Sequence, residues 1–366
     1  YAMWQGGGLS LVDKNTGETE FVRPLGDDST ELRFNWNAAL AQDPFDPNTI
    51  YYGSQFLHRS ADAGRSWKII SPDLSSNDST KLQQRKSGGL TLDVTNAENH
   101  CTIISIAVSP LNRNIIWVGT DDGRLHVTQD AGDTWTEVYV NIKKAPEGAF
   151  IPQVRPSIHS PNEVFIVVNN YRQNDFDTYL YKSTDLGASW ESLVTEEIKG
   201  YALSFLQDYK VPNLLFLGTE QGLYISLDHG DHWNAYRNNY PAVSTMDIAY
   251  NRKEDDLILG TFGRSVYIID NVSGIRDLVE GKWSLQDGLS LVGKSTGYLV
   301  TYNRAPGSRF ISDGGFKGQN EPYGANIDFY IHPKVWKEKS KAKVEILKGQ
   351  EVIRNFHYAV DSGLNR

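Results

Sequence analysis

The sequence has little of four things: cysteine, methionine, basic charge and long hydrophobic runs. A single cysteine, Cys101, among 366 residues excludes internal disulfide bonds and a cage of several thiolates around a metal ion. The net charge of -9 argues against a duplex nucleic acid as partner, because phosphate binding depends on clustered lysines and arginines. The longest apolar runs, such as 102–108 and 214–217, are far shorter than the roughly 18 residues that cross a bilayer. We therefore expect neither a membrane span nor a nucleic-acid partner.

Aromatic residues, glycine and proline are, in contrast, plentiful. The chain has 9 tryptophans, 19 tyrosines, 32 glycines and 14 prolines, a composition that favours many short strands joined by tight turns. With 39% hydrophobic and 22% charged residues, the composition also excludes disordered chains and disulfide scaffolds. An all-β fold is predicted.

One eight-residue pattern, S/T-x-D-x-G-x-x-W, occurs four times, and we call each occurrence a box. The boxes are residues 60–67, 128–135, 183–190 and 226–233. Their tryptophans lie 68, 55 and 43 residues apart, so the repeat unit is about 40 to 45 residues, with insertions in the first two intervals. This is the length of one four-stranded propeller blade. Residues 256–270 repeat the strands without a box, and we interpret them as a degenerate blade, so that five blades and a partial one are expected.

Each box carries the residue types that a hairpin turn requires. The aspartate accepts hydrogen bonds from backbone N–H groups, and the glycine adopts a positive φ. The tryptophan is expected to fold back between neighbouring sheets. A structural role is therefore predicted for the eight boxed residues, which are Asp62, Trp67, Asp130, Trp135, Asp185, Trp190, Asp228 and Trp233.

The boxes resemble those of the Asp-box, or bacterial-neuraminidase-repeat, β-propellers, over roughly residues 1–275. More narrowly, residues 119–123, 212–222 and 263–270 look like a branch of large exported bacterial proteins usually labelled glycosyl hydrolase or sortilin-like. The resemblance implies an exported bacterial chain, in the periplasm, at the cell surface or secreted. Residues 1–24 read as strands of a blade already under way, so we expect the chain to be part of a longer parent protein.

The boxes stop before residue 270, and a different pattern follows. We predict propeller blades over 1–275, a link over 276–304, and the start of an immunoglobulin-like β-sandwich over 305–366. Alternating residues in 326–331 and 343–347 indicate half-buried antiparallel strands. A stretch like 320–325 opens such a sandwich in the resembled family. A sandwich needs about seven strands and this segment offers four or five, so only part of one is expected.

A ligand site is expected where the loops leading into the innermost strands converge on the channel mouth. The residues on these loops that suit a neutral glycan or a peptide are Trp36, Asn37, His100, Arg155 and Tyr201. The alternative is that these side chains simply fill the channel. The sequence shows no H-E-x-x-H pattern, P-loop or G-x-G-x-x-G fingerprint, so we predict no metal ion and no cofactor.

Two functions from different classes remain open. The first is a non-catalytic binding propeller of an exported multidomain protein, which recognises a peptide, a protein or a glycan. The second is a glycoside hydrolase resembling Asp-box xyloglucanases, which requires two carboxylates about 5 to 10 Å apart in one cleft. No catalytic residue can be assigned, because the candidate acids cannot be paired from sequence; they are Asp43, Asp93, Glu98, Asp208 and Asp247.

Overall fold

The computed structural model describes residues 1–26, 30–83, 97, 99–293 and 324–365. Strands hold 42% of the residues and helices 4%, so the predicted all-β fold is confirmed. The helical segments within these residues are α1 (Ser273–Val279) and the 3-10 turns η2 (Tyr139–Asn141) and η3 (Tyr171–Gln173). None of the helices in the described part of the chain is long and apolar enough to cross a membrane.

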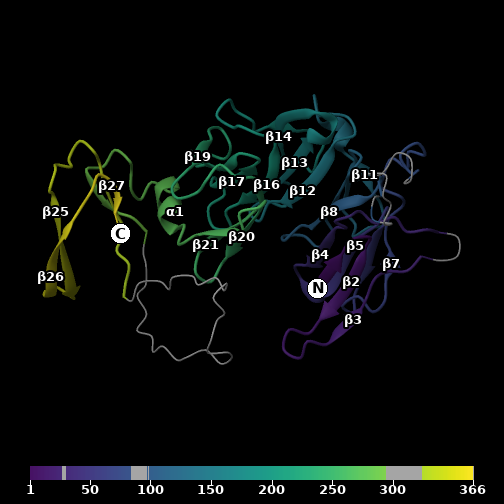
Figure 1. The fold of residues 1–366 in the computed structure, drawn as a ribbon, viewed down its shortest axis with the longest axis horizontal. Helices are drawn as coiled ribbons and strands as arrows, with labels where there is room; N and C mark the ends of the chain where they lie inside the picture. Colours follow the sequence, from purple (N-terminus) through teal and green to yellow (C-terminus); the bar gives the residue numbers. More distant parts are fainter. Residues whose placement is uncertain (27–29, 84–96, 98, 294–323, 366) are drawn as a thin grey trace. The chain divides into compact units, whose positions relative to one another are not determined.

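Six small antiparallel sheets follow one another along the first 269 residues, and we number them as blades 1 to 6 (Figure 1). Blades 2 to 5 have four strands each. Blade 2 consists of β4 (Leu40–Asp43), β5 (Asp46–Gly53), β6 (Leu57–Ser60) and β7 (Lys68–Ile69), and blade 3 of β8 (Ile103–Val108), β9 (Ile116–Thr120), β10 (Leu125–Thr128) and β11 (Thr136–Glu137). Blade 4 consists of β12 (Phe150–Pro156), β13 (Val164–Asn170), β14 (Asp175–Ser183) and β15 (Glu191–Ser192), and blade 5 of β16 (Ala202–Gln207), β17 (Leu215–Thr219), β18 (Gly222–Ser226) and β19 (Asn234–Tyr236). Two have three strands: blade 1 with β1 (Ala2–Trp4), β2 (Gly8–Val12) and β3 (Thr19–Phe21); blade 6 with β20 (Thr245–Asn251), β21 (Asp256–Thr261) and β22 (Val266–Ile269).

The sheets are arranged as propeller blades, because the first strands of successive blades lie beside one another. β4 contacts β8, β8 contacts β12, β12 contacts β16, and β16 contacts β20. These five strands are therefore the inner strands. Among the described residues, six sheets match the expected five blades and a partial one. The blade expected to be degenerate, blade 6, has three strands there and no fourth strand in place of the missing box.

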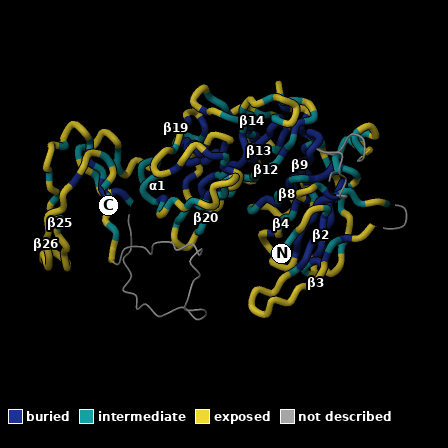
Figure 2. Tube along the Cα trace, in the orientation of Figure 1, coloured by how far each residue is buried: buried dark blue, intermediate teal, exposed yellow. Residues whose placement is uncertain are grey.

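The core lies between blades, and β13 shows how the sequence builds it. All seven residues of β13 are buried (Figure 2). Val164, Ile166 and Val168 pack in one cluster with blade 3, whereas Phe165 and Val167 pack in another with blade 5. Because successive side chains of a strand point to opposite faces, a continuous apolar run fits a strand covered on both sides.

The box turns are built by hydrogen bonds within each box. In the third blade, the carboxylate of Asp130 accepts from the Thr134 N–H (2.8 Å) and the Thr134 hydroxyl (2.6 Å). The same pair of bonds, from a backbone N–H and a hydroxyl, joins Asp62 to Ser66 and Asp185 to Ser189. In the fourth box the His232 imidazole takes the place of the hydroxyl at Asp228. Positive φ occurs at the glycine, as expected, and also at the residue before it, for example Ala131 (60°) and Gly132 (106°).

Three of the box tryptophans bond to the outer strand region of the preceding blade. The indole N–H groups of Trp67, Trp135 and Trp233 donate to the carbonyl oxygens of Val22 (2.8 Å), Ile70 (2.9 Å) and Leu193 (2.9 Å), respectively. Trp190 differs, because its N–H donates to Gly187 within its own box. The boxes thus link neighbouring blades on the side away from the channel.

The contacts divide the chain into two compact units, Tyr1–Asn251 with Leu257–Ile268, and Arg252–Asp256 with Ile269–Arg366. In the second unit, β23 (Leu289–Leu291) pairs with β24 (Phe329–Ile331), which pairs with β27 (Gly363–Asn365). β25 (Lys341–Lys348) and β26 (Glu351–Ala359) form a separate hairpin. The stretch expected as a link therefore holds α1 and β23. Residues 294–323, including most of the stretch expected to open a sandwich, lie outside the described residues, and the immunoglobulin-like assignment stays a prediction.

Candidate functional site

The loops of the propeller lie on two faces, one at each end of the strands, and the candidate loops that lead into the inner strands all lie on the same face. We define the mouth face as the loops that lead into the inner strands together with the hairpins between the second and third strands. A repeated hydrogen bond joins the two kinds of loop: the N–H groups of Asp121, Glu220 and Phe262 donate to the carbonyl oxygens of Thr102 (3.1 Å), Tyr201 (3.1 Å) and Ser244 (2.9 Å), respectively.

The boxes lie at the opposite ends of the strands, which we call the box face. The N–H after each boxed aspartate donates to the carbonyl oxygen of an asparagine near the start of the second strand of the same blade, as Ala131 does to Asn114 (2.9 Å). Loops of the mouth face are therefore separated from the boxed aspartates by the length of the blade strands.

Tyr201 belongs to a group of aromatic side chains on the mouth face. Its ring stacks on that of Tyr171, with 4.6 Å between centroids, and Phe176 lies 6.2 Å away. The Arg172 guanidinium covers the rings of Phe150 (3.7 Å) and Tyr171 (4.5 Å). We call Phe150, Tyr171, Arg172, Phe176 and Tyr201 the aromatic cluster. Tyr171 and Tyr201 are half-buried and Phe176 is 56% exposed, so the cluster offers flat apolar surface to a ligand.

Trp36 and Asn37 lie on the loop that leads into β4, and this loop is anchored to blade 3. The Asn35 amide donates to the Thr102 hydroxyl (3.0 Å) and to the Asp121 carboxylate (2.9 Å). Asp121 also accepts from the Thr102 N–H (2.8 Å). Burial raises the pKa of Asp121 to about 7, while these hydrogen bonds act in the opposite direction. Next to this buried anchor, the Trp36 ring is 50% exposed.

Arg155 was expected on a loop that leads into an inner strand, but it lies within β12, near the end away from that loop. Its side chain reaches an acid two blades away. Its guanidinium is 3.4 Å from the carboxylate of Asp247 on β20, and the Gln153 amide also donates to Asp247 (3.3 Å). Because β12 and β20 are both inner strands, this ion pair crosses the channel. The side chains of Arg155 and Asp247 are 40% and 64% exposed, so solvent reaches this ion pair inside the channel.

His100 lies in the loop that leads into β8, beside Cys101 and Asp122. Burial lowers the pKa of its imidazole. The structure thus places all five predicted residues on the mouth face or in the channel. The loops of Trp36 and His100 are joined, because Asn99 donates to the carbonyl oxygen of Phe34 (3.0 Å), whereas Arg155 and Tyr201 lie among other neighbours.

The candidate acids occupy different places. Asp43 and Asp208 end the inner strands β4 and β16 at the box face, where they accept from the N–H groups of Phe45 (2.7 Å) and Lys210 (2.8 Å). Ser157 caps the corresponding turn of blade 4. Asp247 instead lies in the channel, whereas residues 93 and 98 lie outside the described part of the chain. Asp43 and Asp208 therefore act as turn caps.

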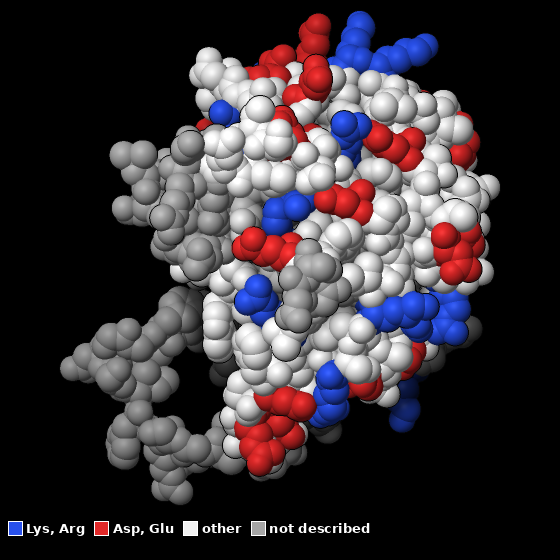
Figure 3. All heavy atoms as spheres, turned by 90° about the vertical axis from the view of Figure 1, so that its right-hand side faces the viewer, with Lys and Arg blue, Asp and Glu red and all other residues white. Residues whose placement is uncertain are grey.

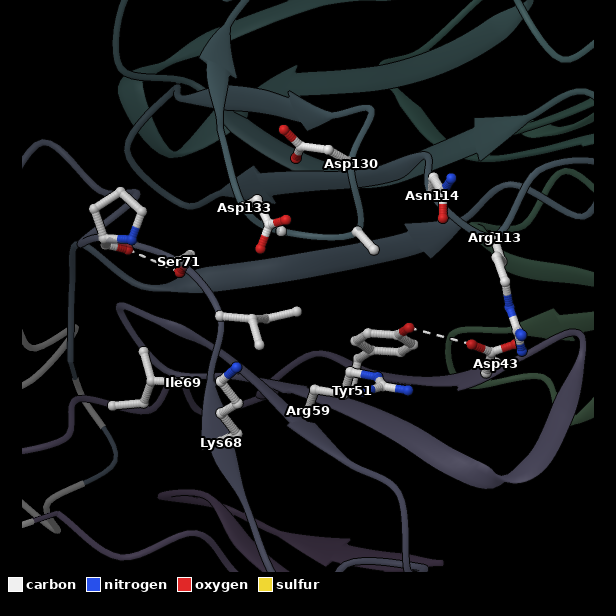
Figure 4. Close-up of a pocket in the computed structure, with 14 residues that line it drawn as sticks. Asp43, Tyr51, Arg59, Lys68, Ile69, Ser71, Arg113, Asn114, Asp130 and Asp133 are labelled. Atoms are coloured by element: carbon white, nitrogen blue, oxygen red, sulfur yellow. Dashed lines mark hydrogen bonds between the residues drawn. The ribbon is translucent and has the colours of Figure 1, made fainter.

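A hollow of about 600 Å³ lies between blades 2 and 3 on the box face (Figure 4). Its polar groups include Arg59, Lys68 and Arg113. In Figure 4 the Tyr51 hydroxyl donates to Asp43 (3.2 Å). Asp130, on the opposite wall, is engaged by its own box. Two of its three acids, Asp43 and Asp130, thus form hydrogen bonds within their own blades, and the hollow follows the groove between these blades.

On the face seen in Figure 3, lysine and arginine side chains are interspersed with aspartate and glutamate side chains.

Phe150, Tyr171, Arg172 and Phe176 are not among the residues predicted from the sequence. That prediction covers only the loops leading into the inner strands, whereas Tyr171 and Arg172 lie in the connection between the second and third strands of blade 4. The repeat register carried the signal, because Tyr171 and Arg172 stand in this connection, with Phe176 just after it in β14, where the corresponding connection of blade 5 has only Glu220 and Gln221.

Comparisons with known proteins bear on the fold. No family model matches the chain, and none of the curated proteins matches it. Among solved structures the chain is similar to the GH74 enzyme of Niastella koreensis, at 13% identity and a TM-score of 0.50, over 73% of this chain and 42% of that one. It is also similar to the GH74 xyloglucanase from Xanthomonas campestris, at 19% identity and a TM-score of 0.47, over 64% of this chain and 36% of that one. A third similar structure is an extracellular domain of a hybrid two component system from B. thetaiotaomicron, at 14% identity and a TM-score of 0.49, over 73% of this chain and 31% of that one. The chain spans less than half the length of each of these proteins. The likeness shows the fold alone: the first unit is a β-propeller.

Proposed function

We propose that this propeller is a non-catalytic binding module of an exported multidomain protein. It takes its ligand on the mouth face, at the aromatic cluster. The observation that carries the proposal is the Tyr171–Tyr201 stack with the exposed Phe176 beside it. Exposed aromatic rings held by neighbours are typical of binding sites, because they add apolar contact area with little loss of side-chain freedom.

A neutral glycan is the ligand that this surface suits best, ahead of a peptide or a protein. The apolar face of a sugar ring can lie on the exposed rings, and its hydroxyl groups need polar side chains nearby. Exposed Gln173, Asn174, Glu220 and Gln221 lie in the connections that carry or adjoin the cluster. Arg172 rests on Phe150 and Tyr171 and so holds the platform in place.

The test is the affinity for neutral oligosaccharides, including those of xyloglucan, measured on a glycan array and then by calorimetry. Phe176→Ala and Tyr201→Ala should each weaken binding about tenfold, because an aromatic contact contributes about 1 kcal/mol or more. Trp36→Ala and Arg155→Ala should weaken it if the ligand extends toward the channel. Phe262→Ala is the matched control, since this exposed phenylalanine lies in the corresponding hairpin of blade 6.

Two outcomes would contradict the proposal. Loss of binding in folded Asp228→Asn, with Tyr201→Ala unaffected, would place the site on the box face. Release of reducing sugar by the wild-type chain would favour the alternative, a glycoside hydrolase. That alternative needs a carboxylate pair about 5 to 10 Å apart in one cleft. Of the described candidates, Asp43 and Asp208 bond to backbone N–H groups of turns on the box face, and Asp247 pairs with Arg155.

A further inference from the structure

Outside the aromatic cluster, the mouth face brings together three side chains that commonly bind metal ions. His100, Cys101 and Asp122 each offer one ligand atom, and these atoms lie within 4.8 Å of one another. Cys101 and Asp122 are buried and His100 is half-buried. Two different loops supply them, the loop leading into β8 and the hairpin between β9 and β10.

The distance between the sulfur and the nitrogen is that of two ligands around one ion. The Cys101 Sγ lies 3.6 Å from the His100 Nδ1. Tetrahedral Zn²⁺, with Zn–S of about 2.3 Å and Zn–N of about 2.0–2.1 Å, places a sulfur and a nitrogen ligand about 3.5 Å apart. These two atoms therefore need almost no movement to share an ion.

The backbone at Cys101 explains how neighbouring residues point to one place. In an extended chain the side chains of His100 and Cys101 would point to opposite faces. Cys101 instead has a φ of 57°, in the left-handed region. Its carbonyl accepts from the Arg33 guanidinium (3.5 Å), and the following N–H, of Thr102, donates to Asp121 (2.8 Å). These two hydrogen bonds, from the Arg33 side chain and to the Asp121 side chain, stabilise the left-handed backbone at Cys101.

The surroundings of the ligand atoms also suit a cation. The Asp122 carboxylate accepts from the Ser76 N–H (2.7 Å) and the Thr120 hydroxyl, which fix its orientation as outer partners of metal ligands do. The Ser76 hydroxyl lies 3.5 Å from the Cys101 Sγ. A neutral thiol has one proton and faces two acceptors, His100 and Asp122. A cation would bind the sulfur, the nitrogen and the carboxylate at once.

We propose that His100, Cys101 and Asp122 form a binding site for Zn²⁺, with a fourth position for water. A thiolate and an imidazole select zinc over magnesium or calcium, which prefer oxygen ligands. Burial raises the pKa of the Cys101 thiol to about 11 in the absence of a metal, so binding should release the thiol proton. The ion would tie the loop leading into β8 to the β9–β10 hairpin.

The experiment titrates the chelator-treated full chain with Co²⁺, which reports a thiolate ligand by a charge-transfer band in the near ultraviolet. We expect about one ion per chain. Cys101→Ser should abolish the band, and His100→Asn and Asp122→Asn should each weaken binding more than about 100-fold, since loss of an outer partner alone weakens it about 10- to 100-fold. His232→Asn is the control, because His232 is 76% exposed and pairs with Asp228 (2.7 Å) on the box face, where metal could bind adventitiously.

A second measurement does not depend on the folding of any variant. X-ray absorption of the zinc-loaded wild-type chain should show one sulfur at about 2.3 Å with nitrogen or oxygen ligands at about 2.0 Å. A zinc environment without sulfur would overturn the proposal. So would Co²⁺ binding that Cys101→Ser retains and His232→Asn loses.

Discussion

At the scale of single residues, the four box tryptophans differ in how deeply they are buried. Trp233 is 2% exposed and donates to Leu193, whereas Trp67, Trp135 and Trp190 are half-buried. We expect Trp233→Ala to lower the free energy of unfolding by about 3–5 kcal/mol, because it leaves a large cavity between blades 4 and 5. Trp36→Ala, at a half-exposed site, should change it by about 0.5 kcal/mol or less. Urea melts that show equal, small losses in both variants would contradict the assignment of the box tryptophan to the core.

Box aspartates should also make stability depend on acid. Hydrogen bonds from Thr134 and Thr128 lower the pKa of Asp130 to about 2. Because this pKa is lower in the folded chain than in the unfolded one, the carboxylate stabilises the fold fully above about pH 4, and the contribution is lost as the pH falls toward 2. The urea midpoints of wild type and Asp130→Asn should therefore differ at pH 6 and converge near pH 2. Thr134→Val should lose part of the same pH-dependent stability, because it removes one hydrogen bond to Asp130. If the urea midpoints of wild type and Asp130→Asn differ equally at every pH, the Asp130 carboxylate is not the source of the acid dependence.

At the scale of elements, the end of the second strand of a blade lies against the inner strand of the next blade. A Cβ at Gly218, in β17, would lie 2.2 Å from the Ser204 Oγ and 2.5 Å from the carbonyl oxygen of Thr245 in β20. Gly218→Ala should therefore destabilise the chain by about 1–3 kcal/mol through overpacking. Gly260 occupies the same position in blade 6, where the nearest atom would be 3.8 Å away, so Gly260→Ala is the control and should be close to neutral. Thermal melts with equal shifts would contradict this packing.

At the scale of the whole molecule, we expect the backbone amides of the two units to differ in their protection from hydrogen exchange. β13 is buried along its whole length, whereas every residue of β26 is exposed (Figure 2). Because amide exchange follows local opening, peptides from 164–170 should exchange slowly and peptides from 351–359 quickly. Hydrogen exchange followed by mass spectrometry checks this. Similar protection in both peptides would show that β25 and β26 are as stable as the blades.

The sequence alone determined the propeller, because the signals that specify a blade are local. The hydrogen bonds of a box join residues two to four positions apart, as from Thr128 and Thr134 to Asp130. A repeat of such turns with apolar strands between them leaves few other folds. The missing fourth strand of blade 6 was less apparent, since a lost box indicates a changed turn and not how many strands pair.

Only the tertiary structure decided which side chains meet at the mouth face. Tyr201 stacks on Tyr171, thirty positions earlier, and Arg155 reaches Asp247, ninety-two positions later. Cys101 faces the same point as His100 only because its backbone is left-handed. Loop conformations of this kind depend on packing and hydrogen bonds between blades, and no periodicity in the sequence encodes them. The repeat therefore predicts where a site can lie, and contacts between distant loops determine what it can bind.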